Sequence, residues 1–113
     1  MRYETRDNLM AELQSLIVPA IENYQRQKKL GIPESDLMQY KATIYWDGKQ
    51  ILASRSRKRH YTKIIDIHKD WLELGMTARA WEKALAKTAA FLEKRGHYPD
   101  RHKITDKTGK LFT

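Results

Sequence analysis

The stretch YKATIYWDGKQILASRSRKRHYTK, residues 40–63, decides the fold, because a β-hairpin pattern in it runs directly into the densest positive charge of the chain. Asp47 and Gly48 predict a two-residue type I′ turn, since both residue types accept a positive φ. Such a turn sets these cross-strand pairs: Trp46 with Lys49, Ile44 with Ile51, and Ala42 with Ala53. Ile44 and Ile51 are then expected on the buried face of the hairpin.

The end of this stretch, residues 55–63, predicts the binding surface. It holds five Lys or Arg and no Asp or Glu in nine positions, whereas the charges of residues 1–33 (+1) and residues 34–54 (−1) cancel. Such a cluster attracts polyanions, and arginine binds phosphate oxygens bidentately. The predicted nucleic-acid contacts are Arg55, Arg57, Lys58, Arg59, His60 and Lys63. The simpler alternatives are a solvated loop and an edge strand whose charge blocks pairing with other chains.

The residues before this stretch predict a helical region, residues 5–30. Apolar side chains form one stripe there at three- and four-residue spacing: Leu9, Leu13, Leu16, Ile17, Ala20, Ile21 and Tyr24. Thr5 or Asp7 caps the start, and Gly31 ends the helix. Pro19 removes a hydrogen bond inside the pattern, so we expect a kink or two shorter helices at that point.

Two interpretations fit residues 62–76. Apolar residues recur at helical spacing: Ile64, Ile67, Trp71 and Leu74. Residues 61–67 also fit a third strand, because they are rich in β-branched side chains. The helix is favoured, because the apolar pattern continues to Leu74 and Gly75 can close a helix there.

Residues 77–95 predict the most regular helix, with Thr77 as its cap and Gly96 at its end. One face is apolar: Trp81, Ala84, Leu85, Thr88, Phe91 and Leu92. The other face carries a basic row: Arg79, Lys83, Lys87 and Lys94. The first three residues of this row are the predicted second set of nucleic-acid contacts. Residues 103–112 predict a C-terminal β-hairpin.

These elements predict a single basic α+β domain over residues 1–113, with an N-terminal helix, a β-hairpin, a helical pair and a C-terminal β-hairpin. If residues 62–74 are helical, the order of elements resembles a winged helix, and this resemblance implies that the second helix of the pair enters the major groove. If residues 60–67 form a strand, the three-stranded sheet backed by helix 77–95 resembles the sheet-based DNA-binding domains of some integrases. That resemblance implies contacts from Arg55–Lys63.

The sequence therefore predicts a non-enzymatic nucleic-acid-binding protein, with duplex DNA favoured over RNA and an accessory or regulatory role in a bacterium, a plasmid or a phage. One alternative is a protein-interaction module or inhibitor that docks on an acidic partner. Another is a small ribonuclease with His60 as base and Arg57 or Arg59 at the phosphate. The three tryptophans, Trp46, Trp71 and Trp81, are expected in the core. The alternative concerns Trp46, beside the turn, which if exposed would stack on a base or anchor a partner.

Composition narrows these possibilities. The chain has 113 residues, of which 41% are hydrophobic and 32% charged, an ordinary globular mixture with a net charge of +8. It has no cysteine, which excludes disulfides and thiolate metal sites, and no recognised metal or cofactor motif. The longest apolar run is too short to span a membrane and no signal-peptide pattern is present, so we expect a cytoplasmic protein without a membrane partner.

Overall fold

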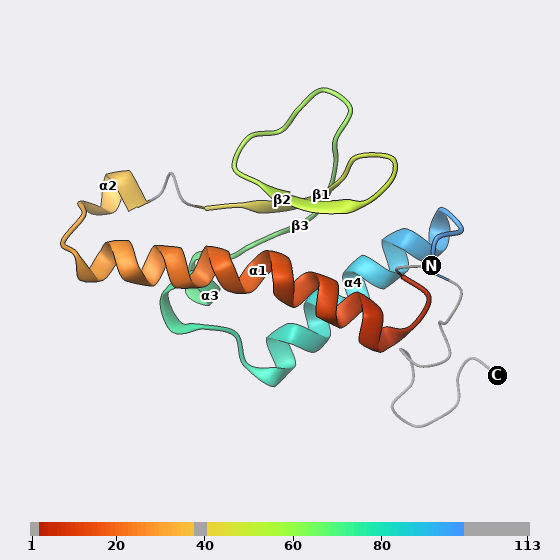
Figure 1. Cartoon of the computed structure of the whole chain (residues 1–113), viewed down its shortest axis with the longest axis horizontal. Helices are drawn as coiled ribbons and strands as arrows, with labels where there is room; N and C mark the ends of the chain where they lie inside the picture. The colour runs from red at the N-terminus through yellow and green to blue at the C-terminus, as the bar shows by residue number, and fades with distance from the viewer. Residues whose placement is uncertain (1–2, 38–40, 99–113) are drawn as a thin grey trace. The chain divides into compact units, whose positions relative to one another are not determined.

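A computed structural model of the chain describes residues 3–37 and 41–98, and it confirms the α+β class (Figure 1). In chain order its elements are α1 (Arg6–Lys29), α2 (Glu34–Leu37), β1 (Thr43–Trp46), β2 (Ile51–Ser54), β3 (Thr62–Asp66), α3 (Lys69–Leu74) and α4 (Ala78–Lys94). Contacts divide the chain into two compact units, residues 15–77 and residues 1–14 with 78–113. A single domain stays a prediction, and the hairpin expected at residues 103–112 lies outside the described residues.

Helix α1 runs unbroken from Arg6 to Lys29, so the alternative of two shorter helices meeting at Pro19 is wrong. Proline in a helix removes one backbone hydrogen bond. The apolar stripe is nevertheless buried on both sides of it, at Ile17 and Ile21. Packing of an amphipathic face contributes most of the stability of a helix in a protein, and here it offsets the lost bond.

Both ends of α1 are capped as the sequence predicts. At the start, Thr5 Oγ1 accepts a hydrogen bond from the Asn8 N–H at 3.1 Å. At the end, Gly31 has a φ of 83°, and the Ile32 N–H donates to the Gln27 carbonyl at 3.2 Å in a Schellman motif.

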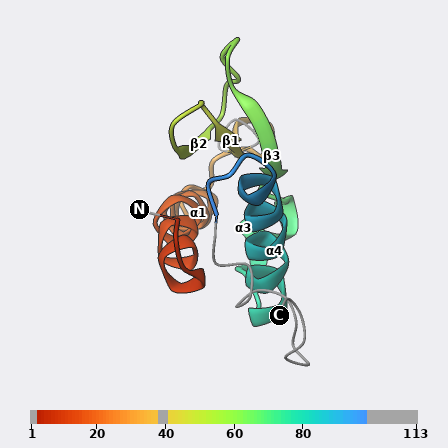
Figure 2. The ribbon, with the colours of Figure 1, turned by 90° about the vertical axis from the view of Figure 1, so that its right-hand side faces the viewer.

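The sheet has three strands in the order β2-β1-β3, and β1 is antiparallel to both of its neighbours (Figure 2). The two outer strands therefore run parallel to each other on opposite edges. The chain that leaves β2 at Ser54 must travel back along the sheet before it can enter β3 at Thr62. Residues 55–61 make this connection, and we call them the crossover loop.

Residues 62–66 form strand β3, so the favoured prediction of a helix from residue 62 is wrong and the third-strand interpretation is confirmed. A helix begins only at Lys69. The register against β1 shifts by one residue at Ile64, and this β-bulge lets both Ile64 and Ile65 be buried. Two adjacent buried residues in a sequence resemble part of a helical pattern, which explains the wrong prediction. The winged-helix interpretation needed a helix over residues 62–74, and that requirement is not met.

The predicted hairpin is present, but its register differs by two residues from the expected one. Trp46 pairs with Ile51 and Ile44 pairs with Ala53, which leaves a four-residue connection, residues 47–50. A shift of two residues keeps each side chain on its own face of the sheet. The predicted burial of Ile44 and Ile51 is therefore confirmed despite the wrong pairing.

The register differs because the Asp47 side chain organises the turn. Its carboxylate accepts hydrogen bonds from the backbone N–H groups of Lys49 and Gln50, each at 2.8 Å. Only Gly48 in this turn has a positive φ, 101°, whereas a type I′ turn needs two such residues. The two backbone donors, with that of Gln50 the stronger influence, lower the pKa of the Asp47 carboxyl below its ordinary value.

Replacing Asp47 with alanine is expected to lower the free energy of unfolding by about 1–2 kcal/mol at neutral pH, because two backbone N–H groups lose a charged acceptor. The lowered pKa makes this contribution complete above the unfolded-state pKa of about 3.9, and it is lost as the pH falls through the folded-state value. Urea unfolding of both proteins, at neutral pH and at a pH below that range, measures the difference.

The matched control is Asp47→Asn, which keeps a side-chain oxygen acceptor but carries no charge. At neutral pH we expect Asp47→Asn to lose less free energy of unfolding than Asp47→Ala. The difference in this free energy between the two variants should change little with pH. Equal losses for the two variants would contradict the proposed role of the acceptor.

The unit of residues 15–77 contains the sheet, α2, α3 and most of α1. Its buried apolar residues are Ile17, Ile21, Tyr24, Leu37, Ile44, Tyr45, Trp46, Ile51, Ile64, Ile65, Ile67 and Leu72. Trp46 is 6% exposed, so its expected place in the core is confirmed and the alternative of an exposed Trp46 is wrong. Trp46 shares the face of β1 with the buried Ile44, and its cross-strand partner is the buried Ile51.

Helix α4 belongs to the other unit and has the two faces that the sequence predicts. Its buried residues are Ala84, Leu85, Thr88, Ala89 and Leu92. The Thr88 hydroxyl donates to the Ala84 carbonyl at 2.8 Å, so this buried polar group is satisfied. In the same unit, the Arg6 guanidinium at the start of α1 forms an ion pair with Glu82.

Candidate nucleic-acid interface

The crossover loop is the candidate interface. It projects from the face of the sheet that points away from the orange half of α1, as both Figure 1 and Figure 2 show. Every residue from Arg55 to His60 is exposed, whereas Tyr61 is half-buried. The loop is therefore attached at its ends and presents its charged middle to solvent.

Short-range hydrogen bonds give the loop a defined shape. At its start, the Ser54 hydroxyl donates to the Ser56 carbonyl at 2.8 Å and accepts from the Ser56 N–H at 3.2 Å. At its end, the Tyr61 N–H donates to the Lys58 carbonyl at 3.0 Å and closes a β-turn. Arg57 Nε donates to the Tyr61 carbonyl at 3.3 Å, which ties the middle of the loop to its end.

Aromatic packing anchors the loop to the sheet. The Tyr61 ring lies 5.4 Å from the ring of Tyr45, which stands on the central strand β1. The His60 ring meets Tyr61 edge-on at 4.8 Å, and Lys58 Nζ lies 6.0 Å from the centre of the Tyr61 ring. The sequence interpretation missed this role of the two tyrosines, because their contact depends on which strand pairs with β1.

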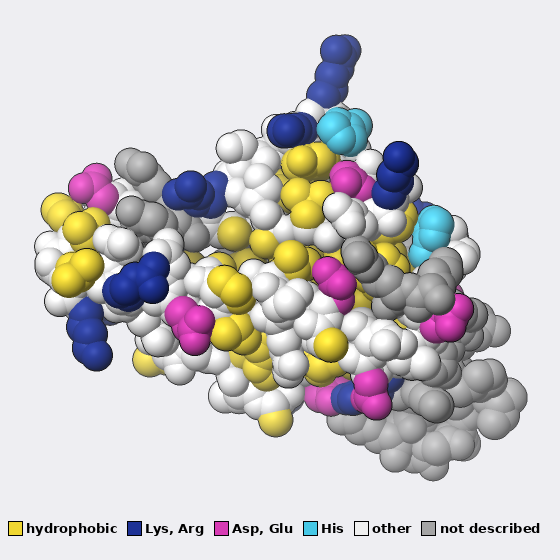
Figure 3. Space-filling view, viewed as in Figure 1, with side chains coloured by type: hydrophobic (Ala, Val, Ile, Leu, Met, Phe, Trp, Pro, Cys, Tyr) yellow, Lys and Arg dark blue, Asp and Glu magenta, His cyan; other side chains and the backbone are white. Residues whose placement is uncertain are grey.

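The charges of the loop differ in how they are compensated. Within the described residues, no carboxylate forms an ion pair with Arg57, Lys58 or Arg59. Lys63 has a partner, since its ammonium lies 3.0 Å from the Asp66 carboxylate and lowers the pKa of that carboxyl. Figure 3 shows Lys and Arg side chains, with a histidine beside them, gathered over this part of the molecule.

The predicted second set of contacts is also exposed. Arg79, Lys83 and Lys87 lie on one face of α4, three to four residues apart, and all three are exposed. They belong to a different compact unit from the crossover loop. The crossover loop and the α4 row are therefore basic surfaces of two different units.

His60 is the candidate base of the ribonuclease alternative. Within the described part of the chain, His60 has a ring contact with Tyr61 but no hydrogen bond to a carboxylate that would orient it as a base. No three potential metal ligands come together in residues 3–37 and 41–98. In the same ranges, no helix combines the length and the apolar character needed to cross a membrane.

Comparison with known proteins adds no family to this description. No protein-family model, no curated protein and no solved structure matches the chain.

Proposed function

We propose that this chain is a non-enzymatic nucleic-acid-binding protein that holds duplex DNA by its phosphates through the crossover loop. The observation that carries the proposal is the group Arg57, Lys58 and Arg59: three consecutive exposed cations, without a carboxylate partner among the described residues, on a loop fixed at both ends. Guanidinium groups bind phosphate oxygens bidentately, and phosphate contacts supply most of the affinity of sequence-independent binding.

The defined shape of the loop is expected to give a higher affinity for DNA than its charge alone would provide. A flexible loop loses conformational entropy when a ligand orders it, and this loss weakens binding. The β-turn that ends at Tyr61 and the packing of Tyr61 on Tyr45 order this loop before it meets a ligand. The cations of the loop would therefore bind phosphates with a smaller loss of conformational entropy.

Two features favour a duplex over a single strand. Proteins that bind single strands without sequence preference stack bases on exposed aromatic rings. Here Trp46 is buried, and Tyr61 packs against Tyr45. Contacts from this loop are thus expected to reach the backbone, and Arg79, Lys83 and Lys87 would add a second row of phosphate contacts. The proposed role is accessory or regulatory and cytoplasmic.

A salt titration tests the proposal. Each neutralised phosphate contributes about −0.9 to the slope of log K against log salt, so the three cations of the loop predict a slope of about −3, and contacts from the α4 row would make it steeper. Fluorescence anisotropy with a labelled blunt duplex, between about 50 and about 200 mM salt, measures that slope. A lack of binding at the lowest salt would contradict the proposal.

Polyglutamate of matched charge is the control, because its carboxylates offer the charge without the regular phosphate spacing. Equal affinity for polyglutamate and the duplex would favour the alternative of an acidic protein partner. The ribonuclease alternative has its own test, since RNA cleavage that disappears in His60→Ala would favour it.

A further inference from the structure

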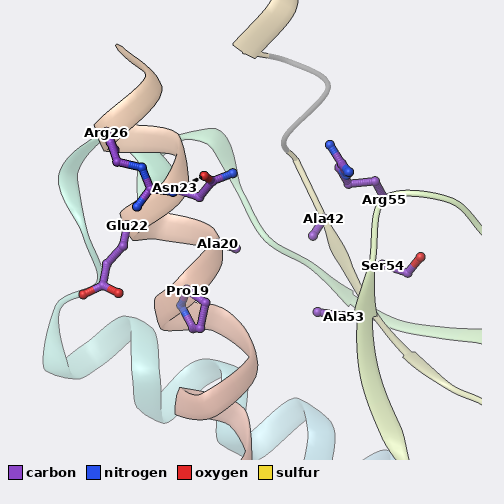
Figure 4. A pocket seen from close by; sticks show the side chains of 9 residues that line it. All are labelled: Pro19, Ala20, Glu22, Asn23, Arg26, Ala42, Ala53, Ser54 and Arg55. Atoms are coloured by element: carbon purple, nitrogen blue, oxygen red, sulfur yellow. Dashed lines mark hydrogen bonds between the residues drawn. The ribbon is translucent and has the colours of Figure 1, made fainter. Parts of the chain in front are cut away.

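A cleft of about 680 Å³ lies between α1 and the β2 edge of the sheet, within the unit of residues 15–77 (Figure 4). Its walls are formed by Pro19, Ala20, Glu22, Asn23 and Arg26 from α1, and by Ala42, Ala53, Ser54 and Arg55 from the sheet. Small-molecule sites commonly enclose about 300–1,000 Å³, so this cleft has the size of a ligand site.

The cleft is open because the facing side chains are small. Ala20 projects from the helix, Ala53 lies on β2, and Ala42 lies directly before β1. Larger apolar residues at these positions would fill the space between the helix and the sheet. Their methyl groups, together with the ring of Pro19, give the cleft an apolar lining (Figure 4).

The other end of the cleft is polar and positively charged. Arg26 Nη2 donates to Asn23 Oδ1 at 2.6 Å, which directs the amide N–H₂ of Asn23 to act as a donor. Figure 4 shows Asn23 and Arg55 reaching toward one another from the two walls, whereas Glu22 points away from the sheet. Two guanidinium groups and one amide therefore surround this end.

We propose that this cleft binds a nucleoside monophosphate unit, presented as an unpaired phosphorylated nucleotide at the end of a DNA strand. The phosphate would lie between Arg26 and Arg55, and the base would lie against the alanine and proline surface. The inference deepens the proposed function and rests on it, because Arg55 is both the first residue of the crossover loop and part of the cleft wall. Arg55, at the β2 edge, would thus be the point at which a strand end passes from the loop to the cleft.

The first experiment compares two labelled duplexes by anisotropy, one blunt and one with a single unpaired 5′-phosphorylated thymidine. The wild-type chain is expected to bind the second about tenfold more tightly, as one additional charge-assisted phosphate contact provides. Equal affinity for the two duplexes would overturn the strand end as the ligand, while binding to both would leave the role of the loop intact.

Two variants locate the preference in the cleft. Ala20→Leu fills the apolar end, and Arg26→Gln removes a cation from the polar end at an exposed position, where folding is not at risk. Each is expected to abolish the preference for the unpaired nucleotide and to leave binding of the blunt duplex within about twofold. The matched control is Lys28→Gln, an equal charge change in the same helical turn outside the cleft wall, and it should keep the preference. A preference that survives Ala20→Leu and Arg26→Gln would overturn the site.

A second measurement is independent of the duplex. Titration of the ¹⁵N-labelled chain with thymidine 5′-monophosphate alone is expected to give saturable shifts of the Asn23 side-chain amide and the Ser54 backbone amide, which Ala20→Leu removes. Absence of these shifts would overturn the cleft as a nucleotide site, whatever the duplex experiments give. Shifts without any duplex binding would instead overturn the loop as a DNA-binding surface and assign the cleft to free nucleotide.

Discussion

Replacing Arg57, Lys58 and Arg59 together with alanine is expected to weaken binding of a blunt duplex by about a hundredfold at low salt, since three phosphate contacts of about 1 kcal/mol each are lost. The same variant should make the salt slope less negative by about 3, the share of its three phosphate contacts. The side chains are exposed and lie outside the core, so the free energy of unfolding should change by less than about 0.5 kcal/mol. Anisotropy and urea unfolding measure the two quantities.

A control with equal charge loss separates local contact from net charge. Lys28, Lys29 and Lys49 are exposed, lie outside the crossover loop and outside the α4 row, and can be replaced with alanine together. If net charge alone drives binding, this variant loses as much affinity as the loop variant, and the loop proposal fails. The alanine variant of Arg79, Lys83 and Lys87 then shows what the second row adds.

Replacing Ile44 with alanine is expected to lower the free energy of unfolding by about 3 kcal/mol, within the usual range for removing a large aliphatic side chain from a core. Ile44 is fully buried and stands on β1, the strand that pairs with both others. A cavity at this position would be flanked by a strand on each side, so the surrounding structure could relax little to fill it. Urea unfolding followed by circular dichroism measures the loss.

Leu52→Ala is the comparison for this prediction. Leu52 lies on β2, an edge strand, and it is half-buried, so we expect a loss of about 1 kcal/mol. Equal losses at the two positions would mean that β1 is not the centre of the core. Because the crossover loop is attached to β1 through Tyr61 and Tyr45, Ile44→Ala is also expected to reduce DNA affinity as the sheet loosens.

Local signals predicted the helix ends and the faces of α4 well. Gly31 and Gly96 both have a positive φ, and each is followed by a residue whose N–H donates back into the helix. These features depend on a few neighbouring residues, and a sequence carries that information directly. The basic residues 55–59 were likewise found from the sequence, because charge density needs no tertiary structure.

The hairpin register and the features set by long-range pairing could not be predicted in the same way. The Asp47 carboxylate competes with the expected type I′ turn and moves the register by two residues. A bulge in β3 buries Ile64 and Ile65 together, which the sequence alone cannot distinguish from a helical turn. The contact of Arg26 and Asn23 with a cleft that also includes Arg55 joins residues about 30 positions apart, and no local pattern marks it.

The order of the strands has a consequence for how relatives of this chain could diverge. The two edge strands are held in register by the central strand, and residues 55–60 between them contribute no buried side chain. Doubling the length of a flexible loop costs only about 0.6 kcal/mol. Insertions and charge changes in this segment can therefore accumulate while the sheet persists, so ligand preference can evolve separately from stability. The same independence makes the segment a suitable position for grafting a foreign recognition peptide.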